Sequence, residues 1–356
     1  MRTAAYEVDV AMRPPQARVS QAKLFVQVVS EIPKRAGITK VQKPEYSVKK
    51  VFFMKWVKNA VGYWCEDILD RKYLGQKIGV SVLDTGMIQH PDLAGRIMGF
   101  DDFVNRRKRI YDDSGHGTHV AGILAGSGKL SNGVYAGIAP EASLLAAKVL
   151  DDSGNGMVEY VMAGIRWVLA EQRKKNIRIV NISVGTQPGL DKAEEERLLE
   201  GVEELWDAGL VVVVSAGNYG PEPGTVAVPG SSRKVITVGA VDIAGRTVGA
   251  GREKWDYSGR GPTEDCIMKP DVVAPGTFIT SCNADYRYRF RKPYTVKSGT
   301  SMATPVVSGA IACLLSKYPD MSNVEVKLKL RASCIPSEQT QGWGMLHVGR
   351  LLSAGI

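Results

Sequence analysis

Ser301 is the side chain whose sequence surroundings best suit a nucleophile. It lies in residues 299–305 (GTSMATP), where a glycine and a threonine precede the serine and Pro305 follows soon after. A proline is tolerated in the first turn of a helix because the amide it lacks would have no partner there, so a helix start is predicted. The apolar residues 306–315 predict that this helix is buried. Its positive dipole end and free amides would stabilise a negative charge developing at Ser301.

A serine hydroxyl is a weak nucleophile at neutral pH and needs a base beside it. Two of the four histidines, His116 and His119, lie in residues 114–122 (SGHGTHVAG), where glycines allow another segment to approach the first histidine. Such a base also needs a carboxylate that fixes its tautomer. Asp84 suits this role because it ends a buried strand in residues 80–86 (VSVLDTG), just before a turn glycine. These residue types together predict nucleophilic catalysis by a serine.

Structural roles for the same side chains are the alternative. Asp84 could be a turn acid at the end of a strand, and His116 could cap a helix. His119 lies three residues beyond His116, on the same side of the predicted helix. A second histidine in that position is more typical of a packed, hydrogen-bonded residue, so we do not assign it to catalysis.

With these residues in place, the chain resembles the subtilisin-like serine proteases, the subtilases. Four stretches carry the resemblance in the family's order, namely residues 84–86 (DTG), 116–122 (HGTHVAG), 215–218 (SAGN) and 299–305 (GTSMATP). The resemblance covers roughly residues 75–350, and four motifs in order at domain-scale separations are very specific. The amino-acid sequence of residues 131–133, 137–142 and 176–185 is most similar to that of the bacterial AprX-type intracellular branch.

The resemblance implies a serine endopeptidase that forms an acyl-enzyme intermediate. Asp84, His116 and Ser301 would be its catalytic triad, with the histidine as the proton carrier. The side-chain amide of Asn218 would donate to the oxyanion together with the Ser301 backbone amide. No cofactor is implied for this chemistry. The alternative for Asn218 is a turn-forming role, since it follows a buried strand and a glycine.

An extended polypeptide is the substrate that the resemblance implies, and residues 183–186 would pair with it as an added strand. The residues implied in substrate binding are Ser183, Val184, Gly185, Ser215, Ala216, Gly217 and Ala227. Many relatives have glycine where Ala227 aligns. We therefore expect a shallower primary pocket that disfavours very large aromatic side chains.

The resemblance also raises a structural calcium ion, because subtilases often bind calcium through oxygen atoms of surface loops. Asp92, in residues 90–93 (HPDL), matches one ligand position. The partner loop at residues 130–133 departs in length from calcium-binding members. An ordinary turn at Asp92 is therefore the alternative.

The basic character of the chain is concentrated near its start. Of the formal net charge of +9 over 356 residues, +7 falls in residues 1–75. No nucleic-acid-binding motif accompanies this segment, so we expect a solvated basic face and no nucleic-acid partner. Binding to nucleic acid that weakens steeply with salt would be the contrary sign.

Cysteine usage and apolar runs predict the compartment. The five cysteines are widely spaced and odd in number, so they cannot all pair within one chain and are expected to be free thiols. No apolar run approaches the roughly 18 residues of a membrane span, and we expect no membrane segment. Residues 1–21 lack the apolar core of a signal peptide. The expected location is the cytoplasm.

Residues 1–70 differ from the rest and are expected to form a basic N-terminal extension or propeptide, with short strands at residues 23–29 and 46–53. In subtilases this region usually holds a propeptide that blocks the active site, so this segment could act as an intramolecular inhibitor. A retained extension that packs on the catalytic domain is the alternative. Residues 71–356 are expected to be the catalytic domain.

The catalytic domain is predicted to have an α/β fold of three layers, with a mainly parallel central sheet covered by helices on both faces. Strands rich in Val, Ile and Leu are expected at residues 78–83, 143–149, 177–183, 210–215 and 235–241. Helices are expected at residues 116–125, 157–174 and 191–207. Active sites of such sheets form at the carboxyl ends of the strands, which is where Asp84, Ser183 and Asn218 fall.

Three other classes of function fit the sequence less well. The DTG triplet at residues 84–86 is also typical of aspartic proteases, but a second triplet is missing. Residues 126–129 (GSGK) lack the other residues of a phosphate-binding loop. A catalytically silent scaffold would keep the fold but usually lose a triad member, and every expected group is present.

Overall fold

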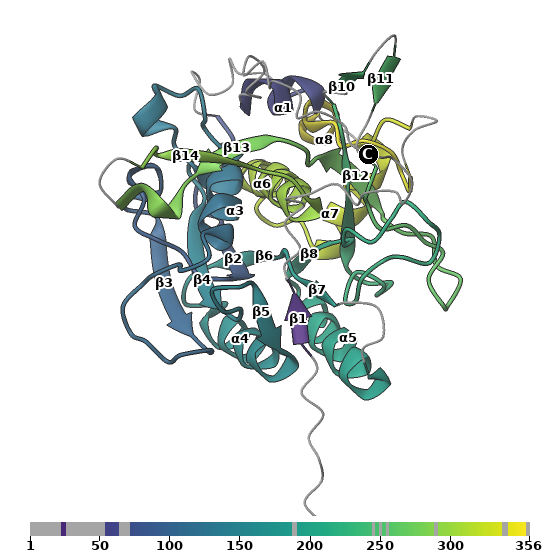
Figure 1. Cartoon of the computed structure of the whole chain (residues 1–356), viewed down its shortest axis with the longest axis horizontal. Coiled ribbons are helices and arrows are strands. Elements are labelled where there is room, and N and C mark those ends of the chain that lie inside the picture. Colours follow the sequence, from purple (N-terminus) through teal and green to yellow (C-terminus); the bar gives the residue numbers. More distant parts are fainter. Residues whose placement is uncertain are drawn as a thin grey trace, which may run out of the picture.

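A seven-stranded sheet forms the centre of the molecule (Figure 1). The computed structural model describes residues 23–25, 54–63, 72–186, 191–243, 246–248, 251–253, 256–287, 291–336 and 341–353. Every pairing in the sheet is parallel, and the strand order is β12-β9-β8-β6-β2-β4-β3. The strands are β2 (Gly79–Asp84), β3 (Ile97–Asp102), β4 (Ser143–Lys148), β6 (Ile177–Ile182), β8 (Val211–Ser215), β9 (Ile236–Val241) and β12 (Val272–Pro275).

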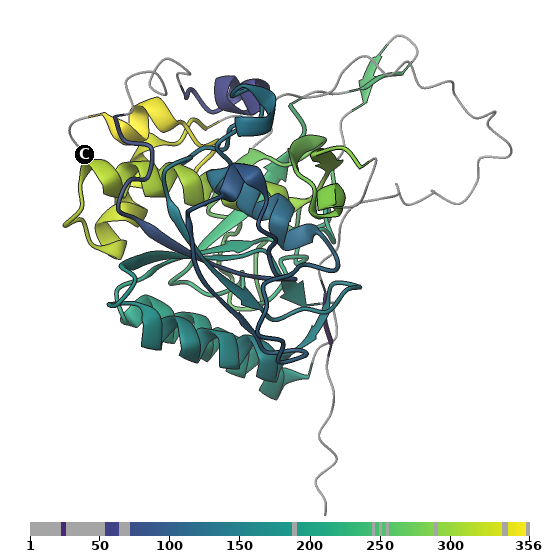
Figure 2. The ribbon, with the colours of Figure 1, turned by 90° about the vertical axis from the view of Figure 1, so that its left-hand side faces the viewer.

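Helices cover both faces of this sheet, as Figure 2 shows. Helices α4 (Val158–Glu171) and α5 (Lys192–Asp207) pack on one face, and α3 (His116–Ala125) and α6 (Thr300–Lys317) pack on the other. The predicted three-layer α/β fold with a mainly parallel sheet is confirmed. The predicted helices and strands match the observed ones to within a few residues.

The burial of the central elements explains their sequences. Every residue of β2 and of β8 is buried, because helices cover the sheet on both sides. Residues 300–315 of α6 are buried as well, which agrees with the apolar pattern of that stretch. Helix α5 lies on the surface and is amphipathic, with its buried side made mainly of apolar residues and glycine.

Several elements were not predicted. They include strands β3 and β12 of the central sheet and the hairpin formed by β13 (Ile279–Cys282) and β14 (Tyr294–Lys297). The others are α1 (Met54–Ala60), α7 (Asn323–Ser333), α8 (Val348–Leu352), the short strands β10 (Arg246–Val248) and β11 (Gly251–Glu253), and the 3-10 helices η1 (Pro91–Leu93), η2 (Lys129–Ser131) and η3 (Ala284–Arg287).

Helix α1 packs into the main core although it lies within residues 1–70, which were predicted to be an N-terminal extension. Met54, Val57 and Val61 are buried in the same apolar cluster as the central sheet. The backbone N–H of Val348, at the start of α8, donates to the carbonyl of Val61 at 2.7 Å. The boundary at residue 70 stays a prediction, but residues 54–63 pack onto the same core as the central sheet.

A second, three-stranded sheet lies beside the central one. Its middle strand is β1 (Lys23–Phe25), which pairs antiparallel with β5 (Asn155–Met157) on one side and β7 (Gly185–Thr186) on the other. Strand β1 covers the start of the strand predicted at residues 23–29. The strand predicted at residues 46–53 lies outside the described residues.

The structure also bears on the predictions of free cysteines and of no membrane segment. Cys266, Cys282, Cys313 and Cys334 are free thiols, and Cys65 lies outside the described residues. Within the described part of the chain, none of the helices combines the length and the apolar character needed to cross a membrane.

Candidate active site

The candidate catalytic side chains meet at the carboxyl edge of the parallel sheet. Asp84 is the last residue of β2, and Ser183 directly follows β6. His116 is the first residue of α3, and Ser301 is the second residue of α6. Because all seven strands are parallel, their carboxyl ends share one edge, and residues far apart in the sequence come together there.

Asp84 and His116 form a buried hydrogen-bonded pair. Asp84 Oδ1 lies 2.7 Å from His116 Nδ1 and also accepts the backbone N–H of Thr85 at 2.7 Å. A proton on Nδ1 makes this bond, so Nε2 is the basic nitrogen of the ring. This Nε2 is buried and has no hydrogen-bond partner within the described part of the chain. The ring is therefore held in the tautomer that can accept a proton.

Gly117 allows α3 to approach the end of β2 this closely. A Cβ at this position would lie 2.1 Å from the carbonyl oxygen of Gly86 and 3.1 Å from Cβ of Asp84. A side chain here would push α3 away from β2. The glycine next to the histidine thus has the role predicted for it from the sequence.

Ser301 lies in the first turn of α6 as predicted, but the expectation for Pro305 was wrong. The helix begins at Thr300, so the proline falls in the second turn. Pro305 has no N–H to donate to the carbonyl of Ser301, four residues earlier. The Ser183 hydroxyl donates to that carbonyl instead, at 3.3 Å. The proline therefore leaves a helix carbonyl available to the Ser183 hydroxyl.

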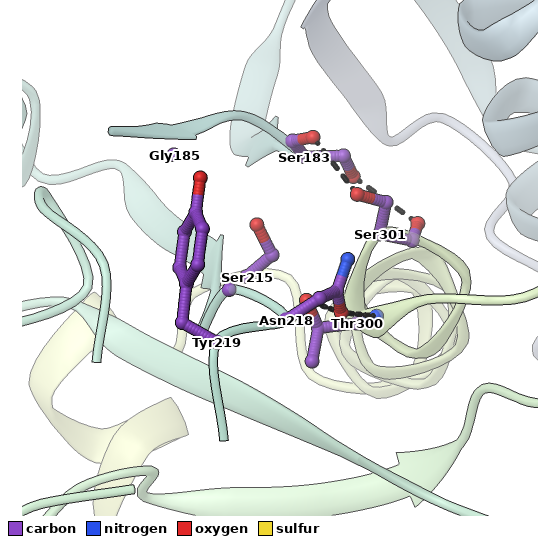
Figure 3. A pocket seen from close by; sticks show the side chains of 8 residues that line it. Ser183, Gly185, Ser215, Asn218, Tyr219, Thr300 and Ser301 are labelled. Atoms are coloured by element: carbon purple, nitrogen blue, oxygen red, sulfur yellow. Dashed lines mark hydrogen bonds between the residues drawn. The ribbon is translucent and has the colours of Figure 1, made fainter. Parts of the chain in front are cut away.

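The hydroxyl of Ser301 donates to the backbone carbonyl of Ser183 at 3.0 Å (Figure 3). The two serines are thus joined by reciprocal hydrogen bonds. Since a hydroxyl carries one proton, Ser301 does not donate to His116 Nε2 in this arrangement. The structure brings Asp84 and His116 into contact, whereas the hydroxyl of Ser301 is hydrogen-bonded to Ser183 instead.

Asn218 is oriented by Thr300, the first residue of α6. Its Oδ1 accepts the backbone N–H of Thr300 at 2.9 Å and the Thr300 hydroxyl at 3.0 Å. Because the oxygen faces Thr300, the amide nitrogen points towards the side chain of Ser301 (Figure 3). The N–H of Ser301 belongs to the first turn of α6, where amides lack an intrahelical acceptor. Two donors can therefore serve an anion beside Ser301.

A small pocket opens beside Ser301. It is open to solvent and is lined by Ser183, Gly185, Ser215, Gly217, Asn218, Tyr219, Thr300 and Ser301. The lining includes most of the predicted substrate residues. Two of the predicted ones, Val184 and Ala216, are fully buried and do not line the pocket.

Ala227 packs against both walls of this pocket without lining it. Its Cβ would lie 2.9 Å from a Cβ built on Gly185 and 2.7 Å from one built on Gly217. The N–H of Ala227 donates to the carbonyl of Ala216 at 2.9 Å, which fixes this segment behind the wall. The methyl group therefore fills the space next to Gly185 and Gly217.

Tyr219 and Thr300 line the pocket but were not predicted. The Tyr219 hydroxyl points towards Gly185 across the pocket (Figure 3). Burial raises the pKa of this phenol, so it is a neutral hydrogen-bonding group at ordinary pH. A tyrosine directly after the SAGN motif was a usable signal, because that motif was already assigned to the pocket.

Strand β1 lies between the two strands that border the site. Leu24 pairs with Gly156 of β5 and with Thr186 of β7, and Phe25 pairs with Asn155 and Gly185. The register therefore runs along β7 towards Ser183, the residue bonded to Ser301. The sequence predicted residues 183–186 as one border for an extended strand, but it did not predict β5 as the other.

His119 is a packed residue, in line with the decision not to assign it to catalysis. Its Nε2 lies 3.1 Å from the carbonyl oxygen of Ile279 and 3.2 Å from that of Thr295, both in the β13–β14 hairpin. Complete burial holds the pKa of His119 well below its ordinary value. The neutral ring ties α3 to the hairpin.

Asp92 does not fit a calcium ligand. Its Oδ1 accepts the Leu130 N–H at 3.0 Å, and its Oδ2 accepts the Tyr294 hydroxyl at 2.7 Å. Among the described residues, His90 and Cys282 complete a cluster with Asp92. Both nitrogens of His90 are engaged, with the Asp92 N–H at 3.1 Å and the Pro293 carbonyl at 3.0 Å. Each carboxylate oxygen thus accepts a hydrogen bond from the protein, and the other members of the cluster offer nitrogen and sulfur, whereas calcium prefers oxygen ligands.

Comparison with known proteins identifies a family. Residues 75–344 match the sequence model of the subtilase family. Over 269 residues, 72% of this chain, the sequence is 42% identical to the serine protease AprX of Bacillus subtilis (strain 168). That match spans 61% of the length of AprX, which is less than two thirds.

Two further relatives extend the comparison. A thermostable alkaline protease of Halalkalibacterium halodurans is 31% identical over 350 residues, covering 97% of this chain and 86% of that protein. Among solved structures, sphericase superimposes with a TM-score of 0.63 at 28% identity, covering 77% of this chain and 92% of the other. Sequence and fold thus agree on the same group of proteins.

Proposed function

The chain belongs to the subtilase family, and we propose that it is a serine endopeptidase that cleaves extended polypeptides through an acyl-enzyme intermediate. The observation that carries the proposal is the buried pair of Asp84 and His116, 2.7 Å apart, with a basic nitrogen that lacks a partner within the described residues. A buried nitrogen of this kind is suited to take a proton from a hydroxyl.

In the proposed reaction, Ser301 Oγ attacks the carbonyl carbon of the scissile peptide bond while His116 Nε2 takes the hydroxyl proton. For this step the hydroxyl rotates away from the carbonyl of Ser183. The imidazolium stays hydrogen-bonded to Asp84, which remains ionised. His116 then gives the proton to the leaving amine, and a water molecule, activated by the same nitrogen, hydrolyses the acyl-enzyme.

The negative charge of the tetrahedral intermediate would be stabilised by two donors. They are the side-chain amide of Asn218 and the backbone N–H of Ser301. The contacts of Asn218 Oδ1 with Thr300, at 2.9 and 3.0 Å, support this assignment because they aim the amide nitrogen at the Ser301 side. Donors that are oriented before the reaction need no reorganisation when the charge develops.

Substrates would bind as an extended strand between β5 and β7, with one side chain in the small pocket beside Ser301. The pairing of β1 with both strands supports this mode. Backbone pairing supplies affinity with little dependence on sequence, and the pocket supplies selectivity. The methyl group of Ala227 behind the walls supports a preference for small or medium side chains over Phe.

The N-terminal segment would act as an intramolecular inhibitor, because β1 occupies the position proposed for the substrate. The burial of Met54, Val57 and Val61 supports a working enzyme that retains α1. Cleavage is therefore expected after Phe25 and before Met54. The chemistry requires no cofactor, and the four free thiols support a location in the reducing cytoplasm.

Intact-mass analysis of the purified protein and of Ser301→Ala tests this function. The wild type should yield a form that begins between residues 26 and 54, whereas Ser301→Ala should stay full length. A fluorophosphonate should label the wild type and not the variant. A folded and shortened wild type that takes up no label would contradict the hydrolase and favour a silent scaffold. If neither protein is shortened but the wild type is labelled, the extension is retained.

A further inference from the structure

The start of helix α3 lacks a cap of its own. Its N-cap residue is Gly115, with φ 78°, and no side chain there can accept a hydrogen bond. The first N–H groups of a helix have no intrahelical acceptors and are usually served by the N-cap side chain. The position of His116, the first residue of α3, therefore depends on acceptors from elsewhere.

Two other side chains provide these acceptors. The N–H of Gly117 donates to the Thr85 hydroxyl oxygen at 3.0 Å, and the N–H of Thr118 donates to Asp112 Oδ2 at 2.8 Å. Thr85 directly follows Asp84 in the chain. The start of α3 is thus attached to the segment that carries the carboxylate partner of His116.

Asp112 is the centre of this attachment. Its Oδ1 accepts the Thr85 hydroxyl and the Gly115 N–H, both at 2.8 Å. Its Oδ2 accepts the Thr118 N–H at 2.8 Å and the Thr118 hydroxyl at 2.7 Å. Thr118 Oγ1 in turn accepts the N–H of Ile88 at 3.1 Å. One carboxylate therefore joins the end of β2 to the first turn of α3.

The neighbouring residue holds the same loop from its other side. Asp113 Oδ1 accepts a hydrogen bond from the buried Lys148 ammonium at 2.7 Å. The same ammonium donates to the carbonyls of Thr85 and Leu150, each at 2.7 Å. The loop between β3 and α3 is thus fixed to Thr85 both through Asp112 and through Lys148.

We propose that Asp112 is a positioning residue that sets the geometry of Asp84 and His116. The proposal rests on the function proposed above. Asp112 touches neither substrate nor the reacting atoms, and it acts through Thr85 and the first turn of α3. Without it, the α3 start and the β2 end lose one of the anchors that they share, and the bond between Asp84 Oδ1 and His116 Nδ1 loosens. Small misplacements of this kind cost catalysis more than binding.

Asp112→Asn and Asp112→Ala test the proposal, with Asp102→Asn as the matched control. The control aspartate also accepts four hydrogen bonds, from the N–H groups of Val104, Asn105 and Arg107 and from the Tyr111 hydroxyl. Its partners lie within its own loop. We expect Asp112→Ala to lower kcat by about 100-fold with little change in KM, and Asp102→Asn to leave kcat nearly unchanged.

A spectroscopic measurement separates positioning from general loss of structure. In the Ser301→Ala background, the downfield proton resonance of His116 Nδ1–H reports its bond to Asp84, and His116→Ala identifies the signal. We expect Asp112→Asn to move or broaden this resonance and Asp102→Asn to leave it in place. If Asp112→Asn does not fold, Thr118→Val removes the hydroxyl contact to Asp112, together with the acceptor of the Ile88 N–H, and should produce a smaller change in the same direction.

The outcomes are distinct. An unchanged resonance and an unchanged kcat in Asp112→Asn would overturn the positioning role, as would equal losses of kcat in Asp112→Asn and Asp102→Asn. A wild type that is folded but hydrolyses no peptide would instead overturn the proposed function. The resonance experiment still tests the contact of Asp84 with His116 in that case.

Discussion

The two sides of the site differ in how far they are assembled. On the β2–α3 side, Asp84 and His116 are already bonded at 2.7 Å, and Asp112 and Lys148 hold the surrounding loop. On the β6–α6 side, the Ser301 hydroxyl is bonded to the carbonyl of Ser183. The base is therefore fixed in advance, while the nucleophile has to rotate before it can react.

The free energies of the hydrogen bonds involved indicate that the Ser301 hydroxyl can rotate at low cost. Exchanging one neutral hydrogen bond for another changes the free energy by only about 1 kcal/mol. Leaving a buried acceptor such as His116 Nε2 without a partner costs about 1–3 kcal/mol. The bond from Ser301 to His116 would satisfy that nitrogen, so rotation is close to neutral or favourable. Rigidity on one side and a low-cost movement on the other are compatible with catalysis.

The largest expected effect tests whether the two sides act as one unit. Ser301→Ala and His116→Ala should each lower kcat by about 10⁶-fold, and the double variant should lose no more. Non-additivity of this kind has been measured in a subtilisin, a relative of this chain, and the magnitude is taken from that case. Steady-state hydrolysis of a peptide substrate by the three variants checks it. Multiplicative losses would show that the sides contribute separately.

Asn218→Ala tests the donor on the β6–α6 side alone. Loss of one oxyanion donor is expected to lower kcat by about 10²–10³-fold while KM stays nearly constant, a magnitude known from a subtilisin. Thr300→Val, which removes only the hydroxyl contact to Asn218 Oδ1, is the milder companion and should cost less. A large rise in KM for Asn218→Ala with kcat intact would assign the residue to substrate binding instead.

Ala227→Gly alters the β6–α6 side at the pocket without touching the triad. Removing the methyl group behind the walls should raise the ratio of kcat/KM for Phe over Ala at the pocket position by about tenfold, since one methyl-sized group is worth about 1–3 kcal/mol. Matched peptides that differ only at that position provide the measurement. In the wild type, equal rates after Phe and Ala would contradict the expected shallow pocket.

Removal of calcium by a chelator should have the smallest effect, and it should alter neither the β2–α3 side nor the β6–α6 side of the site. Because protein donors satisfy both oxygens of Asp92, neither EDTA nor added calcium is expected to shift the melting temperature through this residue. A bound ion at 100 times its dissociation constant would add about 2.7 kcal/mol of stability, which a thermal melt would detect. A stabilisation by calcium that Asp92→Asn abolishes would restore the cation site.

The sequence was most informative where periodicity and burial coincide. The apolar runs that became β2, β6 and β8 are buried on both faces, so their residue types alone predicted strands. Strand β3 was not predicted because it is a half-buried edge strand that contains a glycine and two aspartates. Strand β5 (Asn155–Met157) has no strand-like composition, and the structure shows it paired with β1.

The residues of the site also differ in how well the sequence predicted them. Residues within motifs, such as Asp84 and His116, could be named from the sequence because their chemistry and spacing are local. Tyr219 and Thr300 lie in or beside the motifs, but their roles were not predicted, because these depend on how the SAGN segment faces the start of α6. Asp112 carried an unused signal, since it lies three residues before Gly115, the glycine at the N-cap position of α3. An acid in that position can replace a missing cap.

The placement of β1 between β5 and β7 has a kinetic consequence. A strand attached to its own enzyme competes with free peptides at an effective concentration in the millimolar range for short flexible connections. Activation by self-cleavage would then be a unimolecular event whose lag does not shorten on increasing the enzyme concentration. Activation by one molecule acting on another would show a lag that falls as the protein is concentrated.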